Sequence, residues 1–413
     1  MPTESDKEAE KSRLWFITEL YYPEETSTGY YLTQTAEGLA NDFQVKVICG
    51  QPTYSSRGLR AAKREVRRNV EIFRAAGTTL DKNVIPLRLI NMLTLGVSVF
   101  WNALRRFRHR DTAVVVTTPP SMPFVIAIAA LLRGANYVLL IHDNYPEILF
   151  AAGKSSEASP IATVLGFANR WLYKNAAKII VVGRDMELLL KKKTEGLDVP
   201  IAVIPNWAEL ETVRPAPKEE NKLLRELNLK DELVFLYAGN MGYPNDIETI
   251  VEAAKRLRDR RDVHFIFLGA GVKKPLLTEA LQAYRLTNVT VLDPKPRAEQ
   301  IDFLNACDVA LVSLVPKMLG VSMPSRTYNI LAAGKPILAL VAPGSEVARV
   351  IEDNNIGWHI ESGNVEKLIS TIDEILLRRA ELKTMGDRAR TAAVTRYSLE
   401  TALKRYKEEL AEA

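Results

Sequence analysis

Short apolar runs alternate with longer segments of helical spacing along almost the whole chain. In the first half, apolar runs of strand length cover residues 14–19, 45–49, 113–117, 137–141, 178–182 and 202–204. Segments with helical spacing, such as 30–41 and 162–175, separate these runs. Strand-like runs that alternate with helices are typical of a parallel sheet, so the first half predicts a doubly wound α/β domain.

The same alternation starts again in the second half. Strand-like runs cover 234–238, 264–268, 289–292, 309–312 and 336–340, and helical patterns cover 247–257 and 298–307. Between the halves, the segment ELETVRPAPKEENK is polar and carries two prolines, which is typical of a linker. We therefore predict two doubly wound α/β domains, at 1–208 and 209–395. A chain of 413 residues fits two cores of about 200 residues each.

The composition is globular, with 47% hydrophobic and 25% charged residues. The formal net charge of +5 is too small to imply a nucleic-acid partner. The positive charge is concentrated in segments 57–74 (RGLRAAKREVRRNVEIFR) and 105–110 (RRFRHR). Segment 57–74 fits a solvated helix face, and it equally fits a surface for anionic lipid head groups or a diphosphate-linked acceptor. The sequence leaves both interpretations open.

Several features bear on the compartment. The two cysteines, Cys49 and Cys307, fit no metal-ligand spacing and favour a reducing environment. The first residues are polar and lack the apolar core of a secretory signal. Apolar stretches 91–104 and 121–132 fall short of the about 20 residues that a spanning helix needs. We expect a cytoplasmic protein at the inner face of the plasma membrane, with peripheral contact through 57–110, because Trp101 precedes the basic segment as in interfacial helices.

Two glycine-bearing turns follow predicted strands. Gly239, Asn240 and Gly242 come directly after strand 234–238, and the sequence TSTG at 26–29 follows strand 14–19. A strand, a glycine turn and a helix start present backbone N–H groups to a phosphate. Neither turn is a GxGxxG fingerprint, and such turns are more often structural than functional.

Segment 320–340 (GVSMPSRTYNILAAGKPILAL) carries a stronger signal for an anion site. Pro324 bars a preceding helix, Ser325 suits an N-cap, and the helix Arg326–Ala332 ends before Gly334. A serine hydroxyl, a guanidinium and free N–H groups around one point suit a diphosphate. Three further potential donors crowd the same stretch: Lys317, Ser322 and Thr327.

A third element, His142 and Asp143, lies just past strand 137–141. The carboxyl ends of parallel strands are where α/β sheets bind ligands, and this pair could hydrogen-bond a sugar hydroxyl. A histidine after a strand is as often a packing residue. The sequence contains no Asp-x-Asp pair, HExxH, GxSxG or GxxxxGK[ST] motif. We therefore expect no metal site and no zinc-hydrolase, serine-hydrolase or P-loop chemistry.

Taken together, seven stretches resemble the retaining GT-B glycosyltransferases of family 4. They are YYPEETSTGYYLTQTAEGLA, IHDNYPEILFAAG, VIPNWAELETVRP, YAGNMGYPNDIETIVEAA, FIFLGAG, ACDVALVSL and GVSMPSRTYNILAAGKPIL. The nearest likeness is to the fucosaminyl- and colanic-acid-type branch of bacterial surface polysaccharide synthesis. The resemblance implies two Rossmann-like domains facing across a cleft, with the donor mostly on the C-terminal domain and the acceptor on the N-terminal one. It also implies that a last helix near 399–411, within 396–413, crosses back to the N-terminal domain.

The resemblance also implies roles for individual residues. It places His142 and Asp143 near the transferred sugar and Ser325 and Arg326 at the diphosphate, with His142, Asp143 and Arg326 as catalytic candidates. The implied donor-binding residues are Gly29, Gly239, Asn240, Gly242, Gly320, Ser322, Ser325, Arg326 and Asn329. The family pattern has two glutamates eight positions apart, where this chain has Val321 and Asn329. Asn329 can still hydrogen-bond ribose hydroxyls, whereas Val321 cannot make a polar contact to the donor sugar.

The resemblance implies a metal-independent, retaining transfer from a nucleoside-diphosphate sugar, with UDP favoured. The expected partners are that nucleotide sugar and a glycan or polyprenyl-diphosphate-linked acceptor in cell-surface polysaccharide synthesis, and no separate cofactor is needed. Two alternatives stay open: a GT-B sugar-nucleotide epimerase, and a non-catalytic nucleotide-sugar-binding protein.

Overall fold

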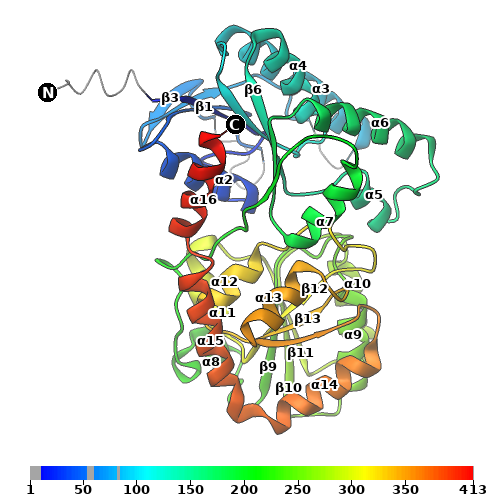
Figure 1. Cartoon of the computed structure of the whole chain (residues 1–413). Helices are drawn as coiled ribbons and strands as arrows, with labels where there is room; N and C mark the ends of the chain where they lie inside the picture. Colours follow the sequence, from blue (N-terminus) through cyan, green and yellow to red (C-terminus); the bar gives the residue numbers. More distant parts are fainter. Residues whose placement is uncertain (1–10, 54–59, 81–83, 413) are drawn as a thin grey trace, which may run out of the picture.

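The computed structural model describes residues 11–53, 60–80 and 84–412 and contains one largely parallel sheet in each half of the chain (Figure 1). The fold class predicted from the alternating pattern is confirmed: two α/β domains have helices on both faces of each sheet. Central strands are buried on both faces, which is why they appear in the sequence as continuous apolar runs.

The N-terminal sheet has eight strands in the order β3-β4-β2-β1-β5-β6-β7-β8. Its strands are β1 Arg13–Ile17, β2 Gln44–Cys49, β3 Arg64–Arg67, β4 Val70–Arg74, β5 Thr112–Val116, β6 Asn136–Ile141, β7 Lys178–Val181 and β8 Ile201–Val203. Its helices are α2 Ser27–Leu39, α3 Ile85–Arg106, α4 Met122–Arg133, α5 Glu147–Ala151, α6 Pro160–Lys174 and α7 Arg184–Lys193. Trp15 and Ile17 of β1 pack with α3 and α4, whereas Leu14 and Phe16 pack on the face that α2 covers.

The C-terminal sheet has six parallel strands in the order β11-β10-β9-β12-β13-β14. They are β9 Leu233–Ala238, β10 Val263–Leu268, β11 Val289–Leu292, β12 Val309–Ser313, β13 Ile337–Leu340 and β14 Gly357–Ile360. Its helices are α8 Lys222–Glu226, α9 Ile247–Arg256, α10 Lys274–Tyr284, α11 Gln300–Leu304, α12 Arg326–Ala332, α13 Glu346–Asn354, α14 Val365–Leu377 and α15 Leu382–Thr395. The five strands predicted here are confirmed within two residues, and β14 is an addition.

The helix interpretation of segment 57–74 is wrong for its described part, because residues 64–74 form the antiparallel hairpin of β3 and β4. Arg68 and Asn69 both have positive φ, as a two-residue hairpin turn requires. Arg57 lies outside the described residues. Much of the hairpin's positive charge is used inside the domain by four ion pairs: Arg64–Glu71, Arg67–Glu37, Arg68–Glu37 and Arg74–Glu65.

The apolar stretch 91–104 belongs to a longer helix than predicted. Helix α3 has 22 residues, because Pro86 is tolerated in its first turn and Arg88 continues it. By length and composition alone, Pro86–Arg106 could cross a membrane, so the expectation that this stretch is too short is wrong. Leu95, Val99 and Ala103 are buried against the sheet, however, and the helix packs beside α4.

Helix α16 Leu399–Ala411 returns to the N-terminal domain and lies beside α2 (Figure 1). Leu403 fills the space above Gly38, where an added Cβ would collide with it. Lys178 Nζ donates to the Glu409 carbonyl oxygen at 2.9 Å and to its carboxylate at 2.7 Å. The chain therefore crosses between the two domains twice.

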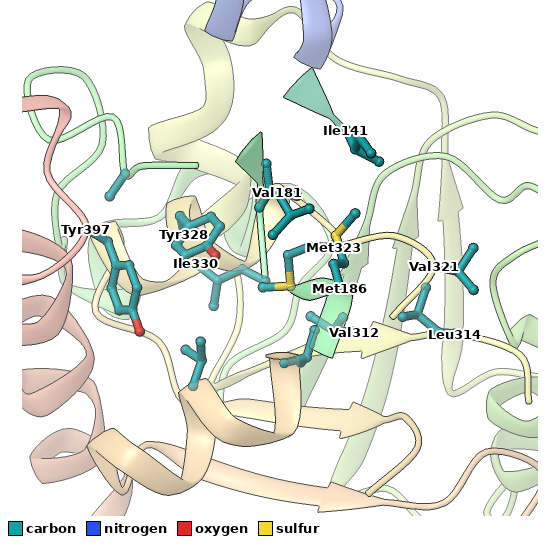
Figure 2. Packing of buried hydrophobic residues seen from close by; sticks show 14 of the residues in the cluster. Ile141, Val181, Met186, Val312, Leu314, Val321, Met323, Tyr328, Ile330 and Tyr397 are labelled. Carbon is teal, nitrogen blue, oxygen red and sulfur yellow. The ribbon is translucent and has the colours of Figure 1, made fainter. Parts of the chain in front are cut away.

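A continuous apolar cluster joins the two domains (Figure 2). Ile141, Val181 and Met186 from the N-terminal domain meet Val321 and Met323 from the loop before α12. Val321, which stands where the family has a glutamate, is therefore a buried core residue. Burial of this cluster holds the edges of the two sheets together, because separation would expose it to water.

Polar groups complete this junction. Asn144 donates from its backbone to the Val321 carbonyl at 2.8 Å and from its amide to the Gly320 carbonyl at 2.7 Å. Asp185 accepts from Gly320 N–H at 3.0 Å. Nearby, the Arg184 guanidinium binds both carboxylate oxygens of buried Glu346. These bonds give the junction a defined geometry that apolar contact alone would not.

We expect Arg184→Ala to lower the free energy of unfolding by about 3 kcal/mol, because the Glu346 carboxylate would stay buried with the Arg184 backbone N–H but without the guanidinium that balances its charge. Thermal and urea unfolding would measure the loss. Arg378→Ala removes two exposed ion pairs and is the matched control, for which we expect little change in the free energy of unfolding. Equal effects of the two changes would show that the Arg184–Glu346 pair does not hold the junction.

Candidate active site

A cavity of about 930 Å³ lies between the two domains. The N-terminal domain contributes Thr26, Ser27, Tyr31 and Asp143, which follow β1 or β6 or lie on α2. The C-terminal domain contributes a larger set: Gly239, Asn240, Asn245, Gly269, Lys295, Arg297, Gln300, Ser322, Ser325, Arg326 and Asn329. The carboxyl ends of both sheets therefore meet at one hollow, the usual ligand position in open α/β sheets.

Arg326, the first residue of α12, is held rigidly at this cavity. Its Nη2 donates to Asn245 Oδ1 at 2.7 Å, and its Nη1 donates to the Ala238 carbonyl at 3.2 Å. The guanidinium also lies 4.4 Å from the centroid of the Tyr237 ring. Gly239 has a φ of +149°, and an added Cβ there would collide with Arg326 Nη1. The turn predicted from Gly239 thus serves to let the arginine approach the strand end.

Ser325 lies directly before α12 as predicted, but its hydroxyl does not cap the helix. Its Oγ lies 2.6 Å from Ser27 Oγ, across the interface between the domains. The predicted side-chain cap is therefore wrong, because the Ser325 hydroxyl is taken up by the opposite domain. Both hydroxyls and Arg326 line the cavity.

Asp143 also lines the cavity and forms an isolated antiparallel bridge with Ser322. Burial raises the pKa of Asp143, and a hydrogen bond from the Ser322 side chain opposes that shift. His142 is not among the cavity-lining residues, and burial lowers its pKa to about 4. The imidazole is therefore neutral near pH 7, where it can donate one hydrogen bond and accept another but carries no charge.

Three predicted glycines do not line the cavity: Gly29, Gly242 and Gly320. Gly29 lies on α2, and an added Cβ would be 2.8 Å from the Glu24 carbonyl. Gly320 has a φ of +72° and forms the junction bonds to Asn144 and Asp185. Lys317 and Thr327, the further donors expected on this stretch, also lie off the cavity: Lys317 is exposed and Thr327 is fully buried.

Asn329 lines the cavity, but protein partners already occupy its amide. Its Nδ2 donates to Glu209 Oε1 at 2.5 Å and to Gln300 Oε1 at 3.0 Å. Its Oδ1 accepts from the Glu209 backbone N–H at 2.9 Å. A buried carboxylate from the interdomain linker is therefore hydrogen-bonded to Asn329, the residue that stands where the family pattern has a glutamate.

Arg297 is a cavity residue that sequence reasoning missed. Its guanidinium binds both oxygens of the Glu209 carboxylate, at 2.6 and 3.1 Å, and its Cζ lies 3.6 Å from the centroid of the Tyr30 ring. Burial raises the pKa of Tyr30 to about 12, so this ring stays neutral. The signal was weak, because Arg297 begins a 3₁₀ helix of only three residues and its partner Glu209 is 88 residues away.

Among the described residues, no group of three or more His, Cys, Asp or Glu side chains is placed to hold a metal ion.

Two sheets that meet at one cavity, with a chain that crosses between them twice, define a protein of the GT-B class. Residues 27–207 match the family described as glycosyl transferase 4-like domain, and residues 219–392 match glycosyl transferases group 1. The chain belongs to glycosyltransferase family 4, so it is a glycosyltransferase by family.

Two curated relatives support this assignment. The chain is 33% identical over 306 residues to the probable glycosyltransferase WbjE of Pseudomonas aeruginosa, and the alignment covers 73% of this chain and 74% of that protein. It is 26% identical over 384 residues to the putative colanic acid biosynthesis glycosyl transferase WcaI of Escherichia coli, and the alignment covers 86% of this chain and 90% of that protein. The resemblance to the colanic-acid-type branch is therefore confirmed.

Solved structures share the fold at low identity. Sucrose-phosphate synthase of Thermosynechococcus elongatus superposes with a TM-score of 0.77 at 15% identity, covering 98% of this chain and all of that one. HepE of Anabaena, solved in complex with UDP-glucose, superposes with a TM-score of 0.72 at 15% identity, covering 97% of this chain and all of that one. The predicted GT-B architecture is confirmed.

The geometry assigns Glu209 a positioning role, which Glu209→Gln tests. We expect the Michaelis constant for the donor to rise about tenfold with a smaller change in kcat, because Arg297 and Asn329 would lose their charged anchor. Glu209→Asp should recover part of the loss. Glu211→Gln, two residues along the same linker at an exposed position, is the control. A fall in kcat alone would contradict a role in donor binding.

His142 generates a pH prediction. Its folded pKa of about 4 lies below the usual value of 6.5, so the unfolded chain binds the proton first as pH falls. Stability should therefore drop by roughly 1–3 kcal/mol between pH 6.5 and pH 4. His142→Gln should flatten this part of the unfolding-midpoint profile, whereas His109→Gln, at an exposed position, should not. An unchanged slope in His142→Gln would refute the assignment.

Proposed function

We propose that this chain transfers a glycosyl group, with retention, from a UDP-linked hexose-type sugar to a hydroxyl of a glycan or polyprenyl-diphosphate-linked acceptor. The placement of Arg326 and Ser325 at the interdomain cavity carries the proposal, since a fixed guanidinium and two hydroxyls that line the same cavity suit a diphosphate. The UDP-glucose complex of the structurally similar HepE supports a UDP-linked donor. The name of WcaI supports a place in surface polysaccharide synthesis.

In the proposed reaction, the bond from the sugar's anomeric carbon to the diphosphate oxygen breaks, and a bond to the acceptor oxygen forms on the same face. The acceptor proton passes to an oxygen of the leaving diphosphate, so charge and atoms balance. Arg326 and Ser325 stabilise the negative charge that develops on the diphosphate, which is the costly part of the step. These groups supply that stabilisation without a metal ion.

Asp143 and His142 would bind the sugar of the donor while it is transferred. Asp143 faces the cavity beside Ser322, and neutral His142 adjoins it in the chain. Hydrogen bonds between sugar hydroxyls and such groups orient the sugar. Of the described residues that line the cavity, Asp143 and Glu25 carry carboxylates.

Arg326→Ala should lower kcat by about 10²–10³-fold, because it removes the charge that stabilises the leaving diphosphate. The rate of UDP release from UDP-sugars in the presence of acceptor measures kcat. Arg326→Lys, which keeps the charge but loses the two-pronged geometry, should recover only part of the rate. Arg258→Ala, at an exposed position of the same domain, is the control. Near-normal turnover by Arg326→Ala would rule out this role.

The donor class can be tested without knowledge of the acceptor. We expect UDP and UDP-sugars to raise the thermal unfolding midpoint more than GDP- or dTDP-sugars, because a ligand of the native state stabilises it. A change of sugar configuration without acceptor would point instead to an epimerase. Tight UDP binding with neither transfer nor sugar release across an acceptor panel would point to a binding protein.

A further inference from the structure

Helices α3, α4 and α6 present an apolar surface to solvent on the N-terminal domain. They cover the same face of the sheet, and α4 contacts both of its neighbours (Figure 1). Twelve of the twenty-four exposed large apolar side chains among the described residues belong to these helices. They are Leu89, Ile90, Leu93, Val97, Trp101, Ile128, Leu131, Leu132, Ile161, Val164, Phe167 and Trp171.

The spacing of these residues makes stripes rather than scattered contacts. On α3, exposed Leu89, Leu93, Val97 and Trp101 recur every four residues, opposite the buried side of the helix. Phe167 of α6 is 75% exposed and Leu93 is 68% exposed. Between α3 and α4 lies an apolar groove of about 440 Å³. Exposed apolar side chains gathered in this number on three packed helices are uncommon in a free soluble monomer and mark a contact site.

The charges on the same three helices indicate what kind of partner the surface binds. The three helices contain no aspartate or glutamate, and their exposed ends carry five cations: Arg88, Arg105, Arg133, Arg170 and Lys174. None of these five forms an ion pair with a described residue. By contrast, the cations of the β3–β4 hairpin are paired inside the domain. The positive charge that has no carboxylate partner among the described residues therefore borders the apolar surface and not the hairpin.

We propose that the α3/α4/α6 surface docks on an anionic lipid bilayer. Apolar side chains would enter the boundary between head groups and acyl chains, Trp101 and Trp171 would lie at the interface, and the five cations would meet lipid phosphates. A second copy of this chain fits less well, because a two-fold contact would set the same cations against each other. The inference deepens the proposed function, since it would bring the cavity close to a lipid-linked acceptor.

The path from this surface to the cavity is short along the chain. Helix α4 starts after the loop that follows β5, and Ser121 at that start lines the groove. Thr117, in the same loop, accepts a hydrogen bond from the backbone N–H of Asp143, which lines the cavity. A membrane-bound α3/α4/α6 surface would therefore be connected to the cavity through this one loop.

Sedimentation of the full chain with lipid vesicles tests the proposal, with neither donor nor acceptor present. We expect strong binding to vesicles of equal parts phosphatidylcholine and phosphatidylglycerol, and weaker binding to phosphatidylcholine alone or at high salt. Leu93→Glu and Phe167→Glu should each reduce the partition coefficient at least about tenfold. Leu377→Glu, at an 89% exposed site on α14 of the other domain, should leave it unchanged.

The unfolding midpoints and the UDP affinity of these variants must equal those of the unchanged protein. We expect this because the substituted residues are exposed. Absence of vesicle binding in the unchanged protein would overturn the proposal, as would equal losses in Leu93→Glu and Leu377→Glu. So would a dimer in sedimentation equilibrium that Leu93→Glu dissociates, without vesicle binding, since a second copy would then cover the surface. Because no transfer is measured, vesicle binding can fail while the proposed glycosyl transfer holds, and the reverse.

Discussion

The apolar junction between the two domains is the constraint on which the rest of the structure depends. Ile141, Val181 and Met186 pack against Val321 and Met323, so the loop before α12 is part of a core shared by both sheets (Figure 2). Because buried interiors pack densely, this loop has little freedom to move alone. The position of Arg326, a few residues further along, is therefore set relative to both domains.

The same junction explains why the chain departs from the family's acidic pair. Val321 lies in the shared core, where an unpaired glutamate would be costly to bury. At the second position, Asn329 binds Glu209, so a carboxylate lies behind the amide instead of on α12. Glu209 in turn anchors Arg297 against Tyr30. Negative charge at this end of the cavity comes from the interdomain linker, and it is balanced by an arginine.

The N-terminal domain combines two demands on its surface. Its β3–β4 hairpin neutralises most of its own cations, whereas α3, α4 and α6 leave theirs unpaired beside exposed apolar stripes. The basic composition of segments 57–74 and 105–110 could not separate these cases, because composition does not show where each charge finds a partner. Alternation in EVRRNVEIF, with a turn at Arg68 and Asn69, was the signal for strands.

The sequence by itself determined the two sheets, most strand positions, and the placement of Ser325 and Arg326 at the start of a helix. Those features depend on short-range periodicity and on local turn and helix signals, which a single chain displays directly. Only the tertiary structure decided that Ser325 meets Ser27, 298 residues away, and that Glu209 holds Arg297 and Asn329. Such pairs arise from the packing of one domain against the other, and local pattern carries no record of that packing.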